Sequence, residues 1–251
     1  MESPRFALTP GARIDVVYRG FAINGVPFRI AEQSGETIIR HVWDAGIILS
    51  AAATCNPVSL LPNGLRTFMQ MTGIYRATKI LEIGTGVGVL GISLAARFPE
   101  AKVVLTDLED AEPLVLDNIG INAPNFPHLL QNVSFRTLDW EDRQFPDWTL
   151  NEKFDLIVMA DVTYNASTFV ALADTLEHLQ KHGARGANVV CCGKRRHDEE
   201  EEFWQIVLRR GFVVHRRTIF TMDLNGIFRH CQDGMKRDGE QMIDFIIMNM
   251  L

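Results

Sequence analysis

Cysteine is scarce in this chain, with four among 251 residues. Cys55, Cys191, Cys192 and Cys231 include no C-x-x-C pair and do not resemble the framework of a disulfide-stapled domain. Cys191 and Cys192 are adjacent, and in a strand their side chains would point to opposite faces, which is poor geometry for holding one ion. The histidines also lack H-x-x-x-H and H-E-x-x-H spacing. We therefore expect buried thiols and no metal site.

Long apolar runs and an excess of positive charge are missing as well. No stretch approaches the roughly 18 consecutive apolar residues that a membrane span requires. Residues 1–10 lack the basic start and apolar stretch of a secretory signal. The formal net charge is -6, whereas proteins that bind nucleic acid usually carry a basic face. We expect a soluble intracellular protein of the cytoplasm, with the nucleus as a second compartment, that binds neither membrane nor nucleic acid.

Short apolar runs alternate with amphipathic stretches of helix length through the centre of the chain. The apolar runs lie at 79–83, 102–106, 133–137, 154–159 and 188–192, and helical stretches lie at 88–97, 111–121, 168–181 and 199–210. This alternation predicts a mostly parallel sheet with helices on both faces. The last two apolar runs, 212–218 and 244–250, have no helix between them, which favours a closing antiparallel hairpin.

The first part of the chain has a different character. Short extended segments such as 14–18 and 28–30 alternate with Gly and Pro and predict a small β-rich extension over 1–41. Residues 42–68 show a helical pattern with interruptions at 56–57 and 62–64, which fits two helices or one broken helix. We expect the doubly wound α/β domain to span 42–251.

A glycine-rich stretch follows the apolar run at 79–83. Gly84, Gly86 and Gly88 lie between a predicted strand and a predicted helix. Glycine suits such a turn because it adopts positive φ and lets backbone N–H groups approach a ligand. Glu82 lies two residues before the first glycine, and Asp107 ends the next strand, where a carboxylate can accept hydrogen bonds from a ribose diol. The pattern favours a nucleoside-containing ligand over a purely structural turn.

A dinucleotide site is the alternative for this motif. Gly86, Gly88 and Gly91 satisfy G-x-G-x-x-G, and Asp107 falls near the spacing expected of that fingerprint. The first glycine should end the strand, however, and here Gly84 does so, which places Val89 where the third glycine belongs. Residues 75 and 79 have Y-x-x-x-K spacing but precede the glycine loop, so they give hydride transfer no support.

The chain resembles the seven-β-strand S-adenosylmethionine methyltransferases in E-I-G-T-G-V-G at 82–88 and T-D-L-E at 106–109. Four separated segments are similar to family 16, the methyltransferase-like family of non-histone protein lysine methyltransferases. They are V-W-D-A-G at 42–46, the glycine loop, L-D-W at 138–140 and M-A-D-V-T-Y at 159–164, with a looser match at 191–197 and the acidic helix after it. The resemblance implies a seven-stranded sheet in the order 3-2-1-4-5-7-6 with the last strand antiparallel, and S-adenosyl-L-methionine as cofactor.

The resemblance also implies roles for individual residues. Asp161 and Tyr164 follow a strand and would face the methyl group as catalytic residues. Asp139 and Trp140 would meet the adenine, and Trp43 would cover the cofactor. The full set implied to bind the cofactor is Trp43, Glu82, Gly84, Thr85, Gly86, Gly88, Asp107, Leu108, Asp139, Trp140 and Ala160.

The basic run at 194–197 precedes a block of acidic residues at 198–202. The favoured interpretation is the solvated start of a helix, with acids near its positive end. Docking of a substrate is the second interpretation.

We expect a protein lysine N-methyltransferase whose partner is a protein substrate, for which the family suggests a translation factor, a chaperone or an AAA protein. We expect the enzyme itself to be a monomer. A lysine amine must lose its proton before it attacks, and burial would lower its pKa. Three other functions stay open: a small-molecule methyltransferase, an NAD-dependent oxidoreductase and a non-catalytic binding subunit.

Overall fold

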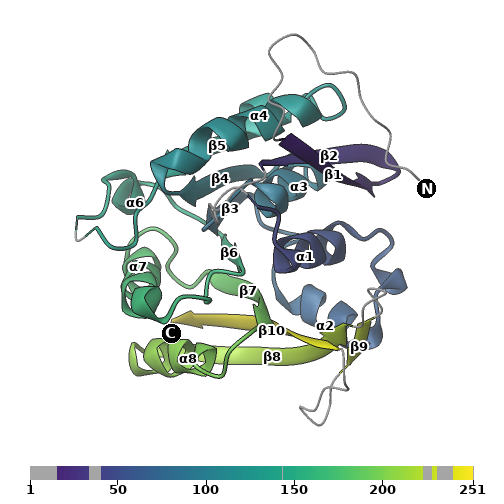
Figure 1. The fold of residues 1–251 in the computed structure, drawn as a ribbon. Helices are drawn as coiled ribbons and strands as arrows, with labels where there is room; N and C mark the ends of the chain where they lie inside the picture. The colour runs from purple at the N-terminus through teal and green to yellow at the C-terminus, as the bar shows by residue number, and fades with distance from the viewer. Residues whose placement is uncertain (1–15, 34–40, 143, 223–227, 231–239, 251) are drawn as a thin grey trace.

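The computed structural model describes residues 16–33, 41–142, 144–222, 228–230 and 240–250, and centres on one large sheet (Figure 1). The sheet has eight strands in the order β5-β4-β3-β6-β7-β10-β8-β9. They are β3 (Lys79–Ile83), β4 (Lys102–Asp107), β5 (Val133–Thr137), β6 (Leu156–Ala160), β7 (Asn188–Arg195), β8 (Phe212–Met222), β9 (Phe228–His230) and β10 (Gln241–Met250).

The sheet is mostly parallel, as the alternating pattern predicts. Strands β3 to β7 pair in parallel, and β10 runs antiparallel to both β7 and β8. Numbering the seven long strands in chain order gives 3-2-1-4-5-7-6. The structure adds β9 as a short eighth strand beside β8, which the sequence pattern did not predict. The rest of the irregular segment 220–241 falls largely outside the described residues.

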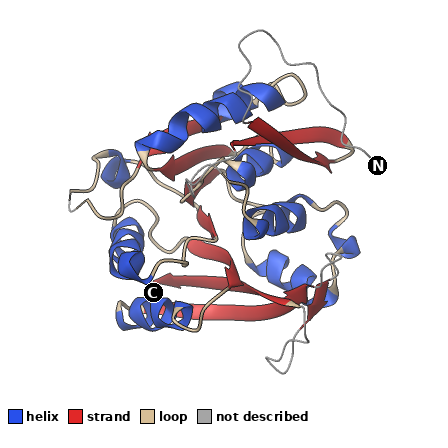
Figure 2. Cartoon of the chain, viewed as in Figure 1, coloured by secondary structure: helices blue, strands red, loops and turns tan. Residues whose placement is uncertain are grey.

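Helices cover both faces of the sheet (Figure 2). On one face lie α1 (Asp44–Thr54), α2 (Asn63–Met71), α3 (Val89–Arg97), α4 (Glu112–Asn122) and α5 (Leu129–Asn132), and on the other α7 (Phe169–Lys181) and α8 (Glu200–Arg209). A short helix, α6 (Trp148–Asn151), precedes β6. The helical region predicted over 42–68 is thus two helices, α1 and α2. In the described residues no helix is long and apolar enough to cross a membrane.

Successive strand residues contribute to opposite cores. In β7, Val190 and Cys192 belong to the core beneath α1 and α3, whereas Val189 and Cys191 belong to the core beneath α7 and α8. The predicted divergence of the two cysteine side chains is therefore confirmed, and both thiols are buried and free. Cys231 lies outside the described residues. Because both faces of these strands are covered, the strands read as continuous apolar runs rather than as alternating ones.

An N-terminal hairpin lies within the segment 1–41, of which the structure describes residues 16–33 and 41. Strands β1 (Val16–Ile23) and β2 (Val26–Gln33) pair antiparallel around Asn24 and Gly25, whose φ values of 52° and 79° suit a two-residue hairpin turn. Phe28 and Ile30 point into the same core as α1, α3 and α4. The hairpin therefore shares a core with the large sheet.

Two asparagines of α4 fasten the hairpin to the helix. The buried Asn118 accepts from Ala31 N at 2.7 Å and donates to Ala31 O at 3.0 Å and Val87 O at 2.8 Å. One turn later, Asn122 makes the same pair of bonds with the backbone of Arg29. These amides bind backbone N–H and C=O groups of Arg29 and Ala31 in β2, and Asn118 also reaches the glycine loop through Val87.

The buried carboxyl group of Glu82 joins β3 to the loop and to α3. Its Oε2 accepts from Thr85 Oγ1 at 2.6 Å and from Gly91 N at 3.0 Å. Burial raises the pKa of Glu82 to about 8, although these hydrogen bonds lower it. Near neutral pH the side chain is therefore largely protonated, and it links β3, the loop and α3 as an uncharged group.

Replacing Asn118 by Ala should lower the free energy of unfolding by about 2–3 kcal/mol, because Ala31 and Val87 would keep buried backbone groups without partners. Urea denaturation measures this change. The matched control is Asn125→Ala, which removes one exposed bond to Pro27 O and should change stability by less than about 1 kcal/mol. Equal losses in the two variants would contradict the role given to Asn118.

Replacing Glu82 by Gln should flatten the pH dependence of stability between about 4.5 and about 8. In that window the folded protein keeps a proton that the unfolded chain has released, so the free energy of unfolding of the wild type falls as pH rises. Gln accepts the same two bonds without titrating. Urea denaturation at several pH values measures both slopes, and parallel curves would show that Glu82 does not carry this proton.

Candidate functional site

The glycine loop lies at the carboxyl end of β3, where open α/β sheets bind ligands. Gly84, Gly86 and Gly88 have φ values of 67°, 54° and 86°, which only glycine adopts readily. A Cβ on Gly84 would stand 2.6 Å from Val162 Cγ1 and 3.1 Å from Trp140 Cζ2. The positions therefore require glycine for backbone conformation and, at Gly84, for space.

A small pocket opens beside this loop. Its volume of about 30 Å³ is that of one water molecule, so it can take only the part of a ligand that lies next to the loop. Six of the predicted site residues line it: Trp43, Glu82, Gly84, Thr85, Gly86 and Ala160. A larger hollow of about 500 Å³ lies between the turn of the N-terminal hairpin and the end of α1, and none of the predicted site residues lines it.

Asp107 ends β4 and reaches back to the loop. Its Oδ2 accepts from Gly86 N at 2.7 Å, and its Oδ1 accepts from Leu108 N at 2.8 Å. Burial raises the pKa of Asp107, and the two backbone hydrogen bonds oppose that rise. The Leu108 side chain beside it is exposed. The carboxylate thus holds the loop in place at the position predicted to read a ribose.

Asp139 and Trp140 follow β5 and differ in their surroundings. The exposed Asp139 accepts from Glu141 N at 2.8 Å, which is a local turn. Trp140 packs against Gly84 and the core beneath α7. Its indole Nε1 is buried and has no hydrogen-bond partner in the part of the chain that the structure describes. A buried donor of this kind is costly unless a ligand supplies the acceptor.

Asp161 follows β6 and is almost fully buried. It is a non-glycine residue with a φ of 53°, a conformation that Asp tolerates better than most side chains. Its Oδ1 accepts from Lys194 N at 2.9 Å and Arg196 Nη1 at 3.0 Å, and its Oδ2 accepts from Arg196 Nη2 at 3.1 Å and Ala45 N at 3.4 Å. The carboxylate predicted to face an incoming amine is therefore one half of a bidentate ion pair.

Tyr164 lies three residues further on and is 42% exposed. Burial raises the pKa of its hydroxyl, and the negative charge of Asp107 raises it further. Strand β6 runs parallel to β3, so the segment that follows β6 and carries Tyr164 leaves the sheet at the same edge as the glycine loop. Of the two residues predicted to be catalytic, Tyr164 is the one that a substrate in solution can reach.

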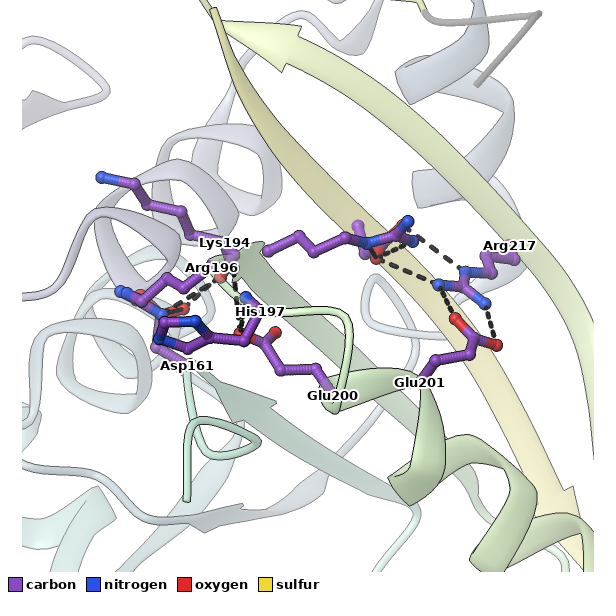
Figure 3. A network of polar contacts seen from close by, with 9 residues as sticks. Asp161, Lys194, Arg196, His197, Glu200, Glu201 and Arg217 are labelled. Carbon is purple, nitrogen blue, oxygen red and sulfur yellow. Dashed lines mark hydrogen bonds and ion pairs between the residues drawn. The ribbon is translucent and has the colours of Figure 1, made fainter. Parts of the chain in front are cut away.

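The basic run at 194–197 is largely paired, so its interpretation as a solvated helix start is wrong for these side chains. Lys194 Nζ lies 2.9 Å from Asp44 Oδ2, and Arg195 binds Asp244 at 2.7 Å. Figure 3 shows Arg196 facing Asp161, while Lys194 extends away from that pair. The acidic block does begin α8, as predicted, and Glu200 accepts from the backbone N–H groups of Arg196 and His197.

Trp43 and Arg196 connect the two sides of the site. Trp43 precedes α1, lines the pocket beside the glycine loop and is 38% exposed. The Arg196 guanidinium carbon lies 5.3 Å from the centre of the Trp43 ring, within the range of a cation–π contact. The sequence did not predict a role for Arg196, because nothing in the run 194–197 shows that it lies at the end of a strand, beside Asp161.

Comparisons with known proteins agree with this geometry. The profile of the family described as lysine methyltransferase matches residues 23–210. The chain is 32% identical over 180 residues to a protein of the UPF0665 family from Schizosaccharomyces pombe, covering 70% of this chain and 49% of the relative. It is 31% identical over 173 residues to the protein N-lysine methyltransferase METTL21A of Danio rerio, covering 69% of this chain and 68% of the relative.

Two further comparisons concern a mouse enzyme and a solved structure. The chain is 30% identical to the EEF1A lysine methyltransferase 3 of Mus musculus, with 70% of this chain and 64% of the relative covered. A crystal structure of a candidate transferase from Pyrococcus horikoshii shares the fold, with a TM-score of 0.52, 12% identity, and 94% of this chain and 72% of that chain covered.

The alignment thus spans about half the length of the fission yeast relative and about two thirds of the two animal enzymes. The match to the family profile covers most of the described domain, including the hairpin strand β2, the glycine loop, Asp161 and Arg196. The chain belongs to the lysine methyltransferase family.

Proposed function

We propose that this protein transfers a methyl group from S-adenosylmethionine to the side-chain amine of a lysine in another protein. The observation that carries the proposal is that a glycine loop, held by Asp107, and the segment with the exposed Tyr164 follow two parallel neighbouring strands at one edge of the sheet. Family membership and the names of two relatives, each called a lysine methyltransferase, support lysine as the acceptor.

The residues present fit an adenosyl ligand. The loop offers backbone without side chains, and Asp107 stands at the end of the neighbouring strand. The Nε1 of Trp140 has no hydrogen-bond partner among the described residues, and it belongs to the same indole as Cζ2, the atom that lies near Gly84. A hydrogen-bond donor is therefore available beside the loop. The residues that would hold the cofactor are Trp43, Glu82, Gly84, Thr85, Gly86, Gly88, Asp107, Leu108, Asp139, Trp140 and Ala160.

The members of this set would act in different ways. Gly84 and Gly86 would approach the cofactor directly, and Asp107 would accept hydrogen bonds from its ribose. Glu82 would act through the loop, because both of its described bonds are to the protein. Trp43 would cover the cofactor from the side of α1, and Trp140 would lie near its adenine.

The chemistry of the transfer requires positioning more than covalent help. When bound, S-adenosylmethionine supplies an electrophilic methyl carbon on a sulfonium. The lysine nitrogen forms the new N–C bond as the C–S bond breaks, and that bonding pair goes to the sulfur. Losing the proton of a lysine near pH 7 costs about 4–5 kcal/mol relative to its ordinary pKa of about 10.4. Tyr164 would present its ring face to the amine and exclude water.

We also propose a protein substrate for this enzyme, with a translation factor first because one relative is named as an EEF1A methyltransferase. A chaperone and an AAA protein are the other candidates. The same proposal places the enzyme in the cytoplasm, with the nucleus as a second compartment, and as a monomer. Residues 42–251 would form the methyltransferase domain, preceded by the extension 1–41.

Incubation with tritiated S-adenosylmethionine and a lysate from cells lacking this protein should label a protein band in an acid-stable, lysine-borne form. Tyr164→Ala should reduce that labelling about 10- to 100-fold without loss of cofactor binding, because the acceptor amine would lose the ring face proposed to cover it. Val170→Ala changes an exposed apolar residue nearby in the sequence, on α7, and should retain the labelling. Label found only in low-mass material would favour a small-molecule methyltransferase.

Asp107→Ala should weaken binding of S-adenosylhomocysteine about 10- to 100-fold, the value of one or two hydrogen bonds to a charged group. Isothermal titration calorimetry measures the dissociation constant directly. Glu109→Ala removes an exposed carboxylate two residues away and is the control. Tight binding of NAD and none of S-adenosylhomocysteine by the wild type would instead support the oxidoreductase.

A further inference from the structure

Four donors converge on one buried carboxylate at the edge of the site. The Asp161 side chain is 2% exposed and receives two backbone N–H groups and both terminal nitrogens of Arg196. A parallel pair of N–H···O bonds from a guanidinium is the strongest and most directional form of such a contact. The charge of Asp161 is thus matched within the protein, without any substrate.

The same guanidinium contacts the aromatic cover of the pocket. Arg196 lies beside the Trp43 ring, and Trp43 lines the pocket of the glycine loop. Arg196 therefore touches one residue predicted to act at the acceptor and one predicted to act at the cofactor. Asp161 bonds Ala45 N in α1, so both contacts also fix the start of α1 against the end of β7.

We infer that Arg196 is a positioning residue for methyl transfer: it fixes Asp161 and cancels its negative charge beside the acceptor lysine, and it supports Trp43 over the cofactor. The inference rests on the proposed function, because it assigns Arg196 to the same site. It differs from the sequence-based expectation, in which Asp161 alone orients the incoming amine.

The charge balance has a direct chemical consequence. An unpaired carboxylate near a lysine would stabilise the ammonium form and raise the pKa of the amine, by about one to three units at close range. Only the neutral amine attacks the methyl group. A carboxylate already bound to Arg196 exerts a much weaker pull, so the lysine loses its proton at a lower pH and more of it is reactive near neutrality.

Other charged and titratable groups surround this pair. Lys194 is paired with Asp44 of α1. Burial lowers the pKa of Arg196, but the carboxylates of Asp161, Glu200 and Asp44 raise it, and the net result is a raised pKa. Burial raises the pKa of the thiols of Cys191 and Cys192 in β7, so both thiols stay protonated. Among the residues that the structure describes, the charged and titratable groups around the site include His41, Asp44, Asp107, Asp161, Tyr164, Cys191, Cys192, Lys194, Arg196, His197 and Glu200.

The neighbouring Arg195 provides a matched control. It binds Asp244 through two nitrogens, and its side chain is 26% exposed, the same fraction as that of Arg196. Asp244 also pairs with Arg217, and Figure 3 shows Arg217 away from the pair of Arg196 and Asp161. Loss of Arg195 thus removes a similar ion pair from the same region without changing the charge beside Tyr164.

The first test is the pH dependence of methyl transfer to the labelled lysate protein, from about pH 6.5 to 9.5, with the full-length chain. Arg196→Gln should move the midpoint of the rising limb up by about one pH unit. Arg196→Lys retains the charge and should keep the wild-type midpoint with reduced turnover, and Arg195→Gln should keep both. Overlapping profiles for Arg196→Gln and wild type, or an equal shift in Arg195→Gln, would overturn the inference.

The second test needs no acceptor. Arg196→Gln should weaken the binding of S-adenosylhomocysteine about two- to fivefold, the value of one cation–π contact, whereas Arg195→Gln should not. Arg196→Gln should also change the tryptophan fluorescence contributed by Trp43. That contribution is identified as the part of the signal missing in Trp43→Phe. Unchanged affinity and fluorescence in Arg196→Gln would overturn the inference. A wild type that binds S-adenosylhomocysteine but labels no protein would refute the proposed function instead, and this second test would still decide the role of Arg196.

Discussion

The hydrogen bonds of Glu82 are the constraint on which the site depends. One carboxyl oxygen joins the end of β3, the hydroxyl of Thr85 and the first turn of α3, so strand, loop and helix cannot move independently. The three glycines between them have no side chains to pack, so the conformation of the loop depends on such bonds from outside it. A second carboxylate, Asp107, fixes the loop from the neighbouring strand.

The buried acids of the site are stabilised in opposite ways. Glu82 lies in a fully enclosed environment whose burial favours the protonated form, and it is bound by neutral donors. Asp161 is equally enclosed but faces the guanidinium of Arg196 and two backbone N–H groups. The two buried carboxyl groups therefore differ in their partners, which are neutral donors at Glu82 and a cationic guanidinium at Asp161. The first acid shapes the cofactor side of the site, and the second adjoins the proposed acceptor side.

The sequence predicts the features that depend on local pattern. The parallel sheet follows from apolar runs separated by amphipathic stretches, and the loop conformation follows from Gly84, Gly86 and Gly88, which adopt the positive φ expected of them. The two helices of residues 42–68 and the antiparallel end of the sheet follow in the same way. Each of these depends on residues close together in the chain or on simple periodicity.

The features that the sequence did not predict depend on distant contacts. Arg196 pairs with Asp161, which lies 35 residues away in the sequence, and Lys194 pairs with Asp44, which lies 150 residues away. Asn118 of α4 binds a strand 87 residues away. Single long-range contacts of this kind leave no periodic pattern in the sequence. A basic run is therefore interpreted as a solvated surface, although the fold of the sheet places an acid next to it. The short strand β9 was not predicted for the same reason, because the residues of β9 do not indicate that they pair with β8.

The position of β10 has a consequence for the assembly of the protein. This strand comes last of the described strands, yet it lies between β7 and β8 and pairs with both. While the chain is being synthesised, β7 therefore presents an open edge, and the strand that leads to Arg196 has a partner on one side only. Open edges invite pairing with other chains. A nascent chain that has not yet released residues 241–250 from the ribosome would thus expose an unpaired strand edge directly beside the future site.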